Sequence, residues 1–264
     1  MRAQIRTLLL LFLVCAACGA ARTAPGHAGE IGQAGGNRDR IDQSTQLLVV
    51  TTPGWDEVNG KLWRYERKRA GVRWRQVGEP IPVVVGQKGL GWGIGLAPIG
   101  IRSGADPVKR EGDRKSPAGI FALGTSFGFS AAPPSGWKVP YLALSPAIEC
   151  VDDVHSKFYN RVVDRGTVTP DWNSSEHMRA VGEYYRWGMV IDQNAGSQPE
   201  GGSCVFLHIR GGDGGGTEGC TAMAKPQIES ILGWLRSEAH PLLIQMPLQQ
   251  YRQVEKDLHL PVLQ

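Results

Sequence analysis

The sequence has little net charge, no long apolar run and no internal repeat, and each absence narrows what it can encode. Charged residues make up 20% of the 264 residues and the net charge is only +4, which argues against a disordered chain and gives no support for nucleic-acid binding. The apolar run at residues 8–14 is shorter than the about 20 residues that a membrane-spanning helix needs. The 35 glycines follow no three-residue period, which excludes collagen. The glycines of residues 89–95 do not match a dinucleotide-binding motif, and the glycine run at residues 214–216 lacks the Gly-Lys-Ser/Thr of a P-loop.

Glycine and proline are abundant, and their abundance indicates the fold class. The chain has 35 glycines and 17 prolines, and both residues are unfavourable inside helices, by about 1 and 3 kcal/mol each. A long helical bundle is therefore excluded. Hydrophobic residues reach 41% of the chain, enough for a sizeable core. We expect one mainly β domain, rich in short strands and turns.

Short apolar or alternating runs, separated by glycine and proline, predict the strands. They cover residues 46–52, 61–67, 72–77, 81–85, 119–123, 139–144, 187–192, 204–209 and 241–246. A helix is expected from Pro226, because apolar residues at helical spacing follow it as far as Leu235. A short terminal helix is expected from Leu248. One or two helices should therefore pack on the strands.

The first residues have the layout of a signal peptide, with positive charges, the apolar run and then small residues, and we assign it to residues 1–21. The small-residue segment is similar to a bacterial lipobox, in which Cys18 would carry a lipid that anchors the protein to a membrane. Plain cleavage just beyond Cys18 is the alternative. Residues 22–44 are polar and glycine-rich and are predicted to be a flexible tether. Residues 45–264 would form a single domain, exported to the bacterial cell envelope.

Three of the five cysteines fall in the predicted folded part, and three is an odd number. An exported protein meets an oxidising compartment, where two of them can pair. Cys150 and Cys204 lie in apolar, strand-like runs, whereas Cys220 lies in a glycine-rich loop. We expect a disulfide between Cys150 and Cys204 and a free thiol at Cys220. The two other pairings remain open from the sequence.

His208 and Cys220 form the strongest candidate for chemistry. Eleven residues separate them and six of these are glycine, so the loop can fold back and bring the thiol to the imidazole. A histidine next to a cysteine favours the thiolate, which is the reactive form. Gly219 can bring backbone N–H groups close to a reacting carbonyl, as an oxyanion hole requires. The alternative is a core histidine and an inert cysteine.

Two segments resemble one known family. The motif Thr217-x-Gly219-Cys220, preceded by His208 at a strand end, resembles the active-site signature of the L,D-transpeptidase, or YkuD-like, catalytic domain. Residues 109–121 are similar to the family segment Gly-Asp…Thr-Pro-x-Gly-x-Phe, with Ser116 in place of the threonine. Residues 185–188 also look like one subgroup of the family.

The resemblance implies a β-sandwich of mixed and antiparallel strands with one or two packed helices. It implies that the Cys220 thiol attacks a carbonyl of a peptidoglycan stem peptide and forms a thioester. His208 would be the general base and then the acid, and the N–H groups of Gly219 and Cys220 would hold the oxyanion. An amine of a second stem peptide would resolve the thioester into a crosslink. The family needs no metal or organic cofactor, and we expect a monomer whose partner is peptidoglycan.

The sequence departs from the family pattern at two positions. Glu218 stands where the signature has a second histidine, and Ala222 stands where an arginine or asparagine is usual. Arg210 would then supply the missing positive group. The expected substrate-binding residues are Thr217, Glu218, Arg210, Tyr185 and Arg186. Two other functions stay open on the same fold: an L,D-carboxypeptidase that uses water as acceptor, and a non-catalytic peptidoglycan-binding module.

Overall fold

The computed structural model describes residues 36–96, 100–212 and 215–263. The predicted signal peptide and the lipidation site Cys18 lie outside the described residues. Among the helices that are described, none is long and apolar enough to cross a membrane.

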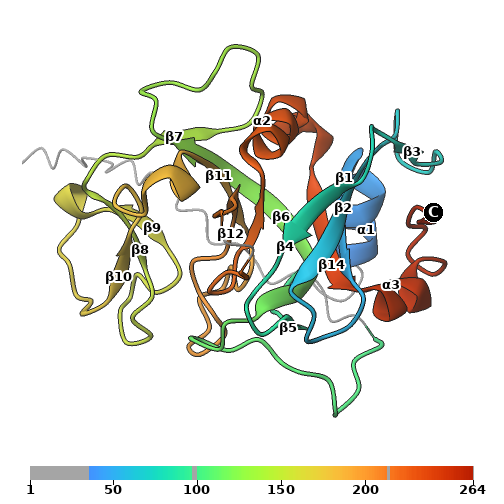
Figure 1. Ribbon diagram of the computed structural model, residues 1–264, viewed down its shortest axis with the longest axis horizontal. Helices are drawn as coiled ribbons and strands as arrows, with labels where there is room; N and C mark the ends of the chain where they lie inside the picture. Colours follow the sequence, from blue (N-terminus) through green and yellow to red (C-terminus); the bar gives the residue numbers. More distant parts are fainter. Residues whose placement is uncertain (1–35, 97–99, 213–214, 264) are drawn as a thin grey trace, which may run out of the picture. The chain divides into compact units, whose positions relative to one another are not determined.

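Eight strands hydrogen-bond in a closed ring (Figure 1). In ring order they are β1 (Gln46–Thr52), β14 (Leu242–Pro247), β6 (Ser116–Gly128), β11 (Trp187–Ile191), β12 (Phe206–Ile209), β13 (Thr221–Met223), β4 (Ile81–Val84) and β2 (Asn59–Glu66). The ring closes at β1, which pairs in parallel with β14 and antiparallel with β2. The mainly β class is confirmed, and the strands form one closed barrel where we expected the two sheets of a sandwich.

The strand β1 is apolar along most of its length and is buried at every residue, as expected for a strand covered on both faces. Its two edges are paired with β14 and β2, and this pairing closes the ring. Three short strands extend the ring: β3 (Arg75–Gln76) pairs with β2, and β5 (Leu90–Trp92) and β7 (Tyr141–Ala143) pair with opposite ends of β6.

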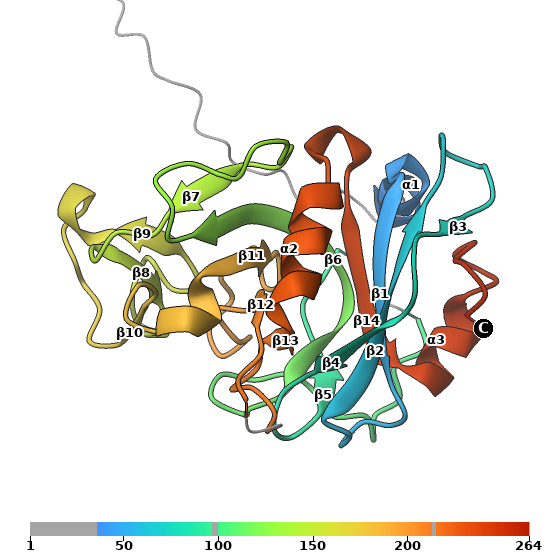
Figure 2. The ribbon, with the colours of Figure 1, turned by 45° about the horizontal axis from the view of Figure 1, so that its top comes forward.

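A small second sheet is inserted between β7 and β11. It consists of β8 (Ile148–Val151), β9 (Val162–Asp164) and β10 (Ser175–His177), with β8 in the centre. Figure 2 shows this sheet beside β11 and β12, on the side away from α1 (Gly36–Gln43). A disulfide between Cys150 of β8 and Cys204, just before β12, joins the small sheet to the barrel and confirms the expected pairing. Cys220 is the free cysteine of the described residues, also as expected.

Two helices lie where the sequence predicts them. The helix α2 (Lys225–Trp234) begins next to Pro226 and buries Ile228, Ile231 and Leu232 against the barrel, where it contacts β11 and β12. The helix α3 (Leu248–Val254) directly follows β14. Three short 3-10 helices complete the described helices: η1 (Arg165–Thr167), η2 (Gly182–Tyr185) and η3 (Ser237–Ala239).

The predicted tether does not extend to residue 44. Residues 36–43 form α1, and Ile41 on this helix is buried in the core. The reason is Arg67, whose buried guanidinium donates hydrogen bonds to the carbonyls of Ile41, Asp42 and Ser44 at 2.6–2.8 Å. Carbonyls at a helix end lack intrahelical partners, so a fixed arginine there stabilises the helix. The sequence around α1 gave no apolar periodicity from which this contact could be predicted.

Candidate functional site

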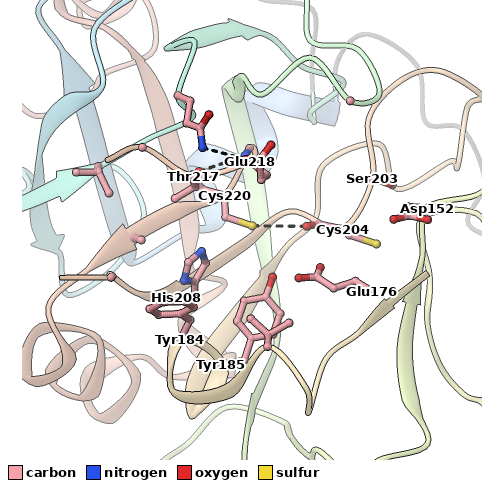
Figure 3. Close-up of a pocket in the computed structure, with 18 of the residues that line it drawn as sticks. Asp152, Glu176, Tyr184, Tyr185, Ser203, Cys204, His208, Thr217, Glu218 and Cys220 are labelled. Atoms are coloured by element: carbon pink, nitrogen blue, oxygen red, sulfur yellow. Dashed lines mark hydrogen bonds between the residues drawn. The ribbon is translucent and has the colours of Figure 1, made fainter. Parts of the chain in front are cut away.

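Strand register places His208 and Cys220 on the same side of the barrel wall. The strands β12 and β13 pair in parallel, with Leu207 opposite Thr221 and His208 opposite Ala222. Leu207 faces the barrel interior with the core, so the alternation of side chains turns His208 outward. Cys220 lies one residue before β13 and shares this outward face. Both side chains line a cleft of about 600 Å³, shown in Figure 3.

Two hydroxyl groups hold the backbone at Cys220. The carbonyl of Cys220 accepts hydrogen bonds of 2.6 Å from Ser116 Oγ and from Thr217 Oγ1. Ser116 Oγ also accepts a 2.8 Å hydrogen bond from the Gly86 backbone N–H, and its side chain is fully buried. Ser116 belongs to the second family-like segment, and Thr217 belongs to the signature. The two motifs, about one hundred residues apart in the chain, therefore meet at Cys220.

The Cys220 side chain is in the thiol form when the cleft is empty. Its sulfur accepts a 3.3 Å hydrogen bond from the Phe206 N–H and lies 3.6 Å from the Cys204 carbonyl, to which the thiol donates. Burial, followed by the nearby Glu176 carboxyl, raises the pKa of the thiol to about 12. A nucleophilic attack therefore needs a base to remove the proton.

The His208 imidazole has the form of a base. Its Nδ1 lies 2.8 Å from the carbonyl of Ile209, and a carbonyl only accepts, so Nδ1 carries the proton. The Nε2 lone pair is then available. The ring packs edge-on against Tyr185, with 5.2 Å between the ring centres. Burial lowers the pKa of His208 to about 4, so the resting pair is a neutral thiol and a neutral imidazole.

The other wall of the cleft is acidic and comes from the small sheet. Glu176 of β10 is paired with Cys150 of β8, and Asp152 lies two residues beyond Cys150 on the same face. Burial, and then Asp152, raise the pKa of Glu176 to about 7. Asp152 Oδ1 is buried and has no hydrogen-bond partner. The Tyr185 hydroxyl lies between the Glu176 carboxyl and the Cys220 thiol (Figure 3).

A buried lysine stands beside the Cys220 loop. The Lys109 side chain is 3% exposed, and its ammonium is 2.6 Å from Asp113 Oδ1 and 2.7 Å from the Arg110 carbonyl. Gly219 has a φ of +145°, and a Cβ built there would lie 3.7 Å from Lys109 Nζ. The lysine charge partly offsets the effects of burial and Glu176 on the pKa of Cys220.

The structure brings together three of the five predicted substrate-binding residues. Thr217, Glu218 and Tyr185 line the cleft. Glu218 is at the rim, where its exposed carboxylate pairs with Arg114 and accepts a hydrogen bond from Gln87. Within the described residues the lining does not include Arg210 or Arg186, whose role in substrate binding stays a prediction.

The two arginines make different contacts. Arg186 forms an ion pair with Glu183 and stacks over Phe129. The backbone N–H of Arg210 donates to the Met223 carbonyl at the end of the β12–β13 ladder. Arg210 follows His208 by two positions, so strand alternation places it on the same outward face as His208. In the cleft lining of the described residues, the positive charge is on Lys109.

Gly219 has a different contact from the one expected. We expected its N–H to serve an oxyanion hole, but this N–H donates a 3.1 Å hydrogen bond to Thr217 Oγ1. Sequence reasoning also missed Glu176, Asp152 and Lys109 as site residues. For Lys109 a signal existed, because Asp113 follows it by four residues inside the second motif. Glu176 lies in a polar segment that gives no such signal.

The arrangement is suited to acyl transfer through a cysteine. A thiol, an imidazole with a free lone pair and a buried cation share one cleft, and these are the groups that nucleophilic catalysis by a cysteine uses. In the described part of the chain, no group of three or more His, Cys, Asp or Glu side chains is placed to hold a metal ion. Comparisons with protein-family models, with curated proteins and with solved structures gave no match to this chain.

Proposed function

We propose that this chain is an exported cysteine acyltransferase with an L,D-transpeptidase-like fold, acting on peptidoglycan stem peptides in the bacterial cell envelope. The observation that carries the proposal is the meeting of the two family-like motifs at one atom. Ser116 Oγ of the second motif and Thr217 Oγ1 of the signature both donate to the Cys220 carbonyl. A segment kept only for folding would have no need to fix the backbone of a free cysteine that opens into a cleft.

The reaction would begin with proton transfer from Cys220 to His208. Nε2 takes the thiol proton, and the thiolate attacks the carbonyl of the donor peptide at its L,D bond. Collapse of the tetrahedral intermediate breaks the carbon–nitrogen bond, and the imidazolium gives its proton to the departing amine of the terminal D-residue. The product of this half-reaction is a thioester on Cys220.

The second half-reaction would resolve the thioester. A side-chain amine of an acceptor stem peptide attacks the thioester carbonyl, His208 accepts the amine proton, and Cys220 leaves as the thiol. Lys109, next to Gly219, places a positive charge close to the developing negative charge. The Gly219 N–H can join the stabilisation of this charge only by leaving Thr217 Oγ1. Processing at Cys18, with or without a lipid, would place a monomeric enzyme at the envelope.

Incubation with tetrapeptide muropeptides tests the proposal. The full chain should convert monomers into crosslinked dimers, detected by mass spectrometry, and Cys220→Ala should not. A carbapenem should add its mass to the peptide that contains Cys220. Ser126→Ala is the matched control, because it changes a buried residue outside the cleft and keeps the proposed nucleophile. Trimmed monomers would instead indicate an L,D-carboxypeptidase, and unchanged substrate without an adduct would indicate a non-catalytic wall-binding module.

A further inference from the structure

The Tyr185 hydroxyl has one proton and two competing acceptors. It faces both the Glu176 carboxyl and the Cys220 sulfur, and Figure 3 shows it between them. A phenol donates a single hydrogen bond, so it can support the charge on only one of these groups at a time. The two groups are therefore in competition for the same proton.

The surrounding packing leaves little besides this proton free to move. The Tyr185 ring is 3% exposed and packs against the rings of Phe127, Phe206 and His208 at 5.2–5.5 Å. Glu176 is fixed by its pairing with Cys150, which is joined covalently to Cys204. Cys204 in turn supplies the carbonyl to which the Cys220 thiol donates. The Glu176 carboxyl, the Tyr185 hydroxyl and the Cys220 thiol are therefore held next to one another in this order.

We propose that Glu176 is a positioning residue that controls the protonation of Cys220 through the Tyr185 hydroxyl. While Glu176 is ionised, the hydroxyl donates to its carboxylate and the thiol keeps its proton. Once Glu176 is protonated or its charge is neutralised, the hydroxyl turns to the sulfur. It then stabilises the thiolate that forms when His208 Nε2 takes the thiol proton. The inference rests on the proposed role of Cys220 as the nucleophile.

The charged and titratable groups that face the thiol come from several elements. Besides the exposed Tyr184 and Glu218 of the cleft lining, they are His208 of β12, Tyr185 of η2, Glu176 of β10, Asp152 beyond β8, and Lys109 and Glu111 before β6. Two of them are already engaged elsewhere. Lys109 is paired with Asp113, and Glu111 accepts a 2.5 Å hydrogen bond from the Tyr159 hydroxyl. Figure 3 shows the Glu176 carboxyl beside the Tyr185 hydroxyl and Asp152 farther away, so the competition for the phenol proton is between Glu176 and Cys220.

Alkylation of Cys220 by iodoacetamide tests the proposal in the full-length protein. Its rate is followed against pH by mass spectrometry of the peptide that contains Cys220, so that the N-terminal cysteines do not interfere. Glu176→Gln should shift the rate profile toward lower pH and raise the rate by up to about tenfold at pH 8, where the wild-type carboxyl, with its pKa of about 7, is mostly ionised. In the Tyr185→Phe background, which keeps the packed ring, the same Glu176→Gln change should give only a small part of this gain.

Glu111→Gln is the matched control, because it breaks a second tyrosine–glutamate pair in the same cleft and should leave the profile in place. An unchanged profile in Glu176→Gln overturns the proposal. An undiminished gain in the Tyr185→Phe background also overturns it, because Glu176 would then act on the sulfur without the hydroxyl. Failure of the proposed function would give a different result. If the wild-type protein leaves muropeptides unchanged but the alkylation rates follow the expected pattern, the proposed substrate is wrong and the control of Cys220 by Glu176 still holds.

Discussion

The two walls of the Cys220 cleft are built in different ways. The barrel wall carries His208 and Cys220 on β12 and β13, which belong to a closed ring of hydrogen-bonded strands. The opposite wall carries Glu176 on a three-stranded sheet that is joined to the barrel by one disulfide. The first wall carries the proposed nucleophile and base, and the second supplies a carboxyl that opposes ionisation of the thiol.

The difference shows how one site can combine a wall from the closed barrel with a wall from a separate small sheet. In the barrel wall each backbone position is fixed by a neighbour on either side, so its geometry follows from the ring. The small sheet is fixed by the disulfide and by Asn160, whose side chain donates to the carbonyls of Gln193 and Asn194 and accepts from the Cys204 N–H. We therefore expect changes in the barrel wall to affect chemistry, and changes in the small sheet to affect its control.

The largest expected effect comes from the base on the barrel wall. His208→Asn removes the group proposed to take the Cys220 proton, and the rate of acylation by a carbapenem should fall by about 10²–10⁴-fold. Asp152→Asn on the opposite wall should change the same rate by less than about tenfold. Rapid-mixing mass spectrometry measures both. Equal losses in the two variants would contradict the division of labour between the walls.

The disulfide should decide whether the small sheet stays in place. Cys150 and Cys204 are 54 residues apart, and replacing both with alanine should lower the free energy of unfolding by about 2–4 kcal/mol. Hydrogen exchange should become faster at the amides of β8 and β10, while those of β12 remain protected. Uniformly faster exchange in both regions would show that barrel and small sheet unfold as one unit.

The sequence carries much more information about the barrel wall than about the small sheet. The run before His208 is apolar and the following loop is rich in glycine, and both features come from neighbouring residues. The strands of the small sheet are only three or four residues long, which is too short for a period to be recognised. Glu176 is buried there only through contacts with distant parts of the chain, so local sequence gave no sign of it.

Closure of the barrel was equally hidden from sequence reasoning. The strand 46–52 is predicted with its observed bounds, but its apolar run does not say which strands border it. Its partners, β14 and β2, come from opposite ends of the chain. The predicted strand 72–77 is reduced to β3, because Val72 is exposed and has no strand to pair with. Pattern thus predicts which residues are buried, and long-range pairing decides the architecture.

The free energy of unfolding should depend on pH in opposite directions for the two walls, through His208 on one and Glu176 on the other. The pKa of His208 is lowered to about 4, so the unfolded state binds a proton that the native state lacks, and stability rises between about pH 4 and 6.5. The pKa of Glu176 is raised to about 7, so the native state holds a proton that the unfolded state loses, and stability falls between about pH 4.5 and 7. Each effect amounts to at most about 3 kcal/mol, and they oppose each other.

Urea unfolding at pH 4.5, 5.5 and 6.5 measures this balance. Relative to the wild type, Glu176→Gln should make stability rise more steeply with pH, because only the histidine effect remains. His208→Asn should make stability fall more steeply with pH over the same interval. If neither variant changes the slope, the two groups titrate alike in the native and unfolded states, and the electrostatic contrast between the walls is absent.

The smallest expected effect compares two serines of the same strand, β6. Ser116 and Ser126 are both fully buried, and each donates to a carbonyl, Ser116 to Cys220 at 2.6 Å and Ser126 to Pro140 at 2.7 Å. Replacing either with alanine should cost about 1 kcal/mol of unfolding free energy. Only Ser116→Ala should also slow alkylation of Cys220, by a few-fold, because it loosens the backbone that carries the thiol. Equal slowing by Ser126→Ala would mean that the barrel as a whole, and not this contact, positions the nucleophile.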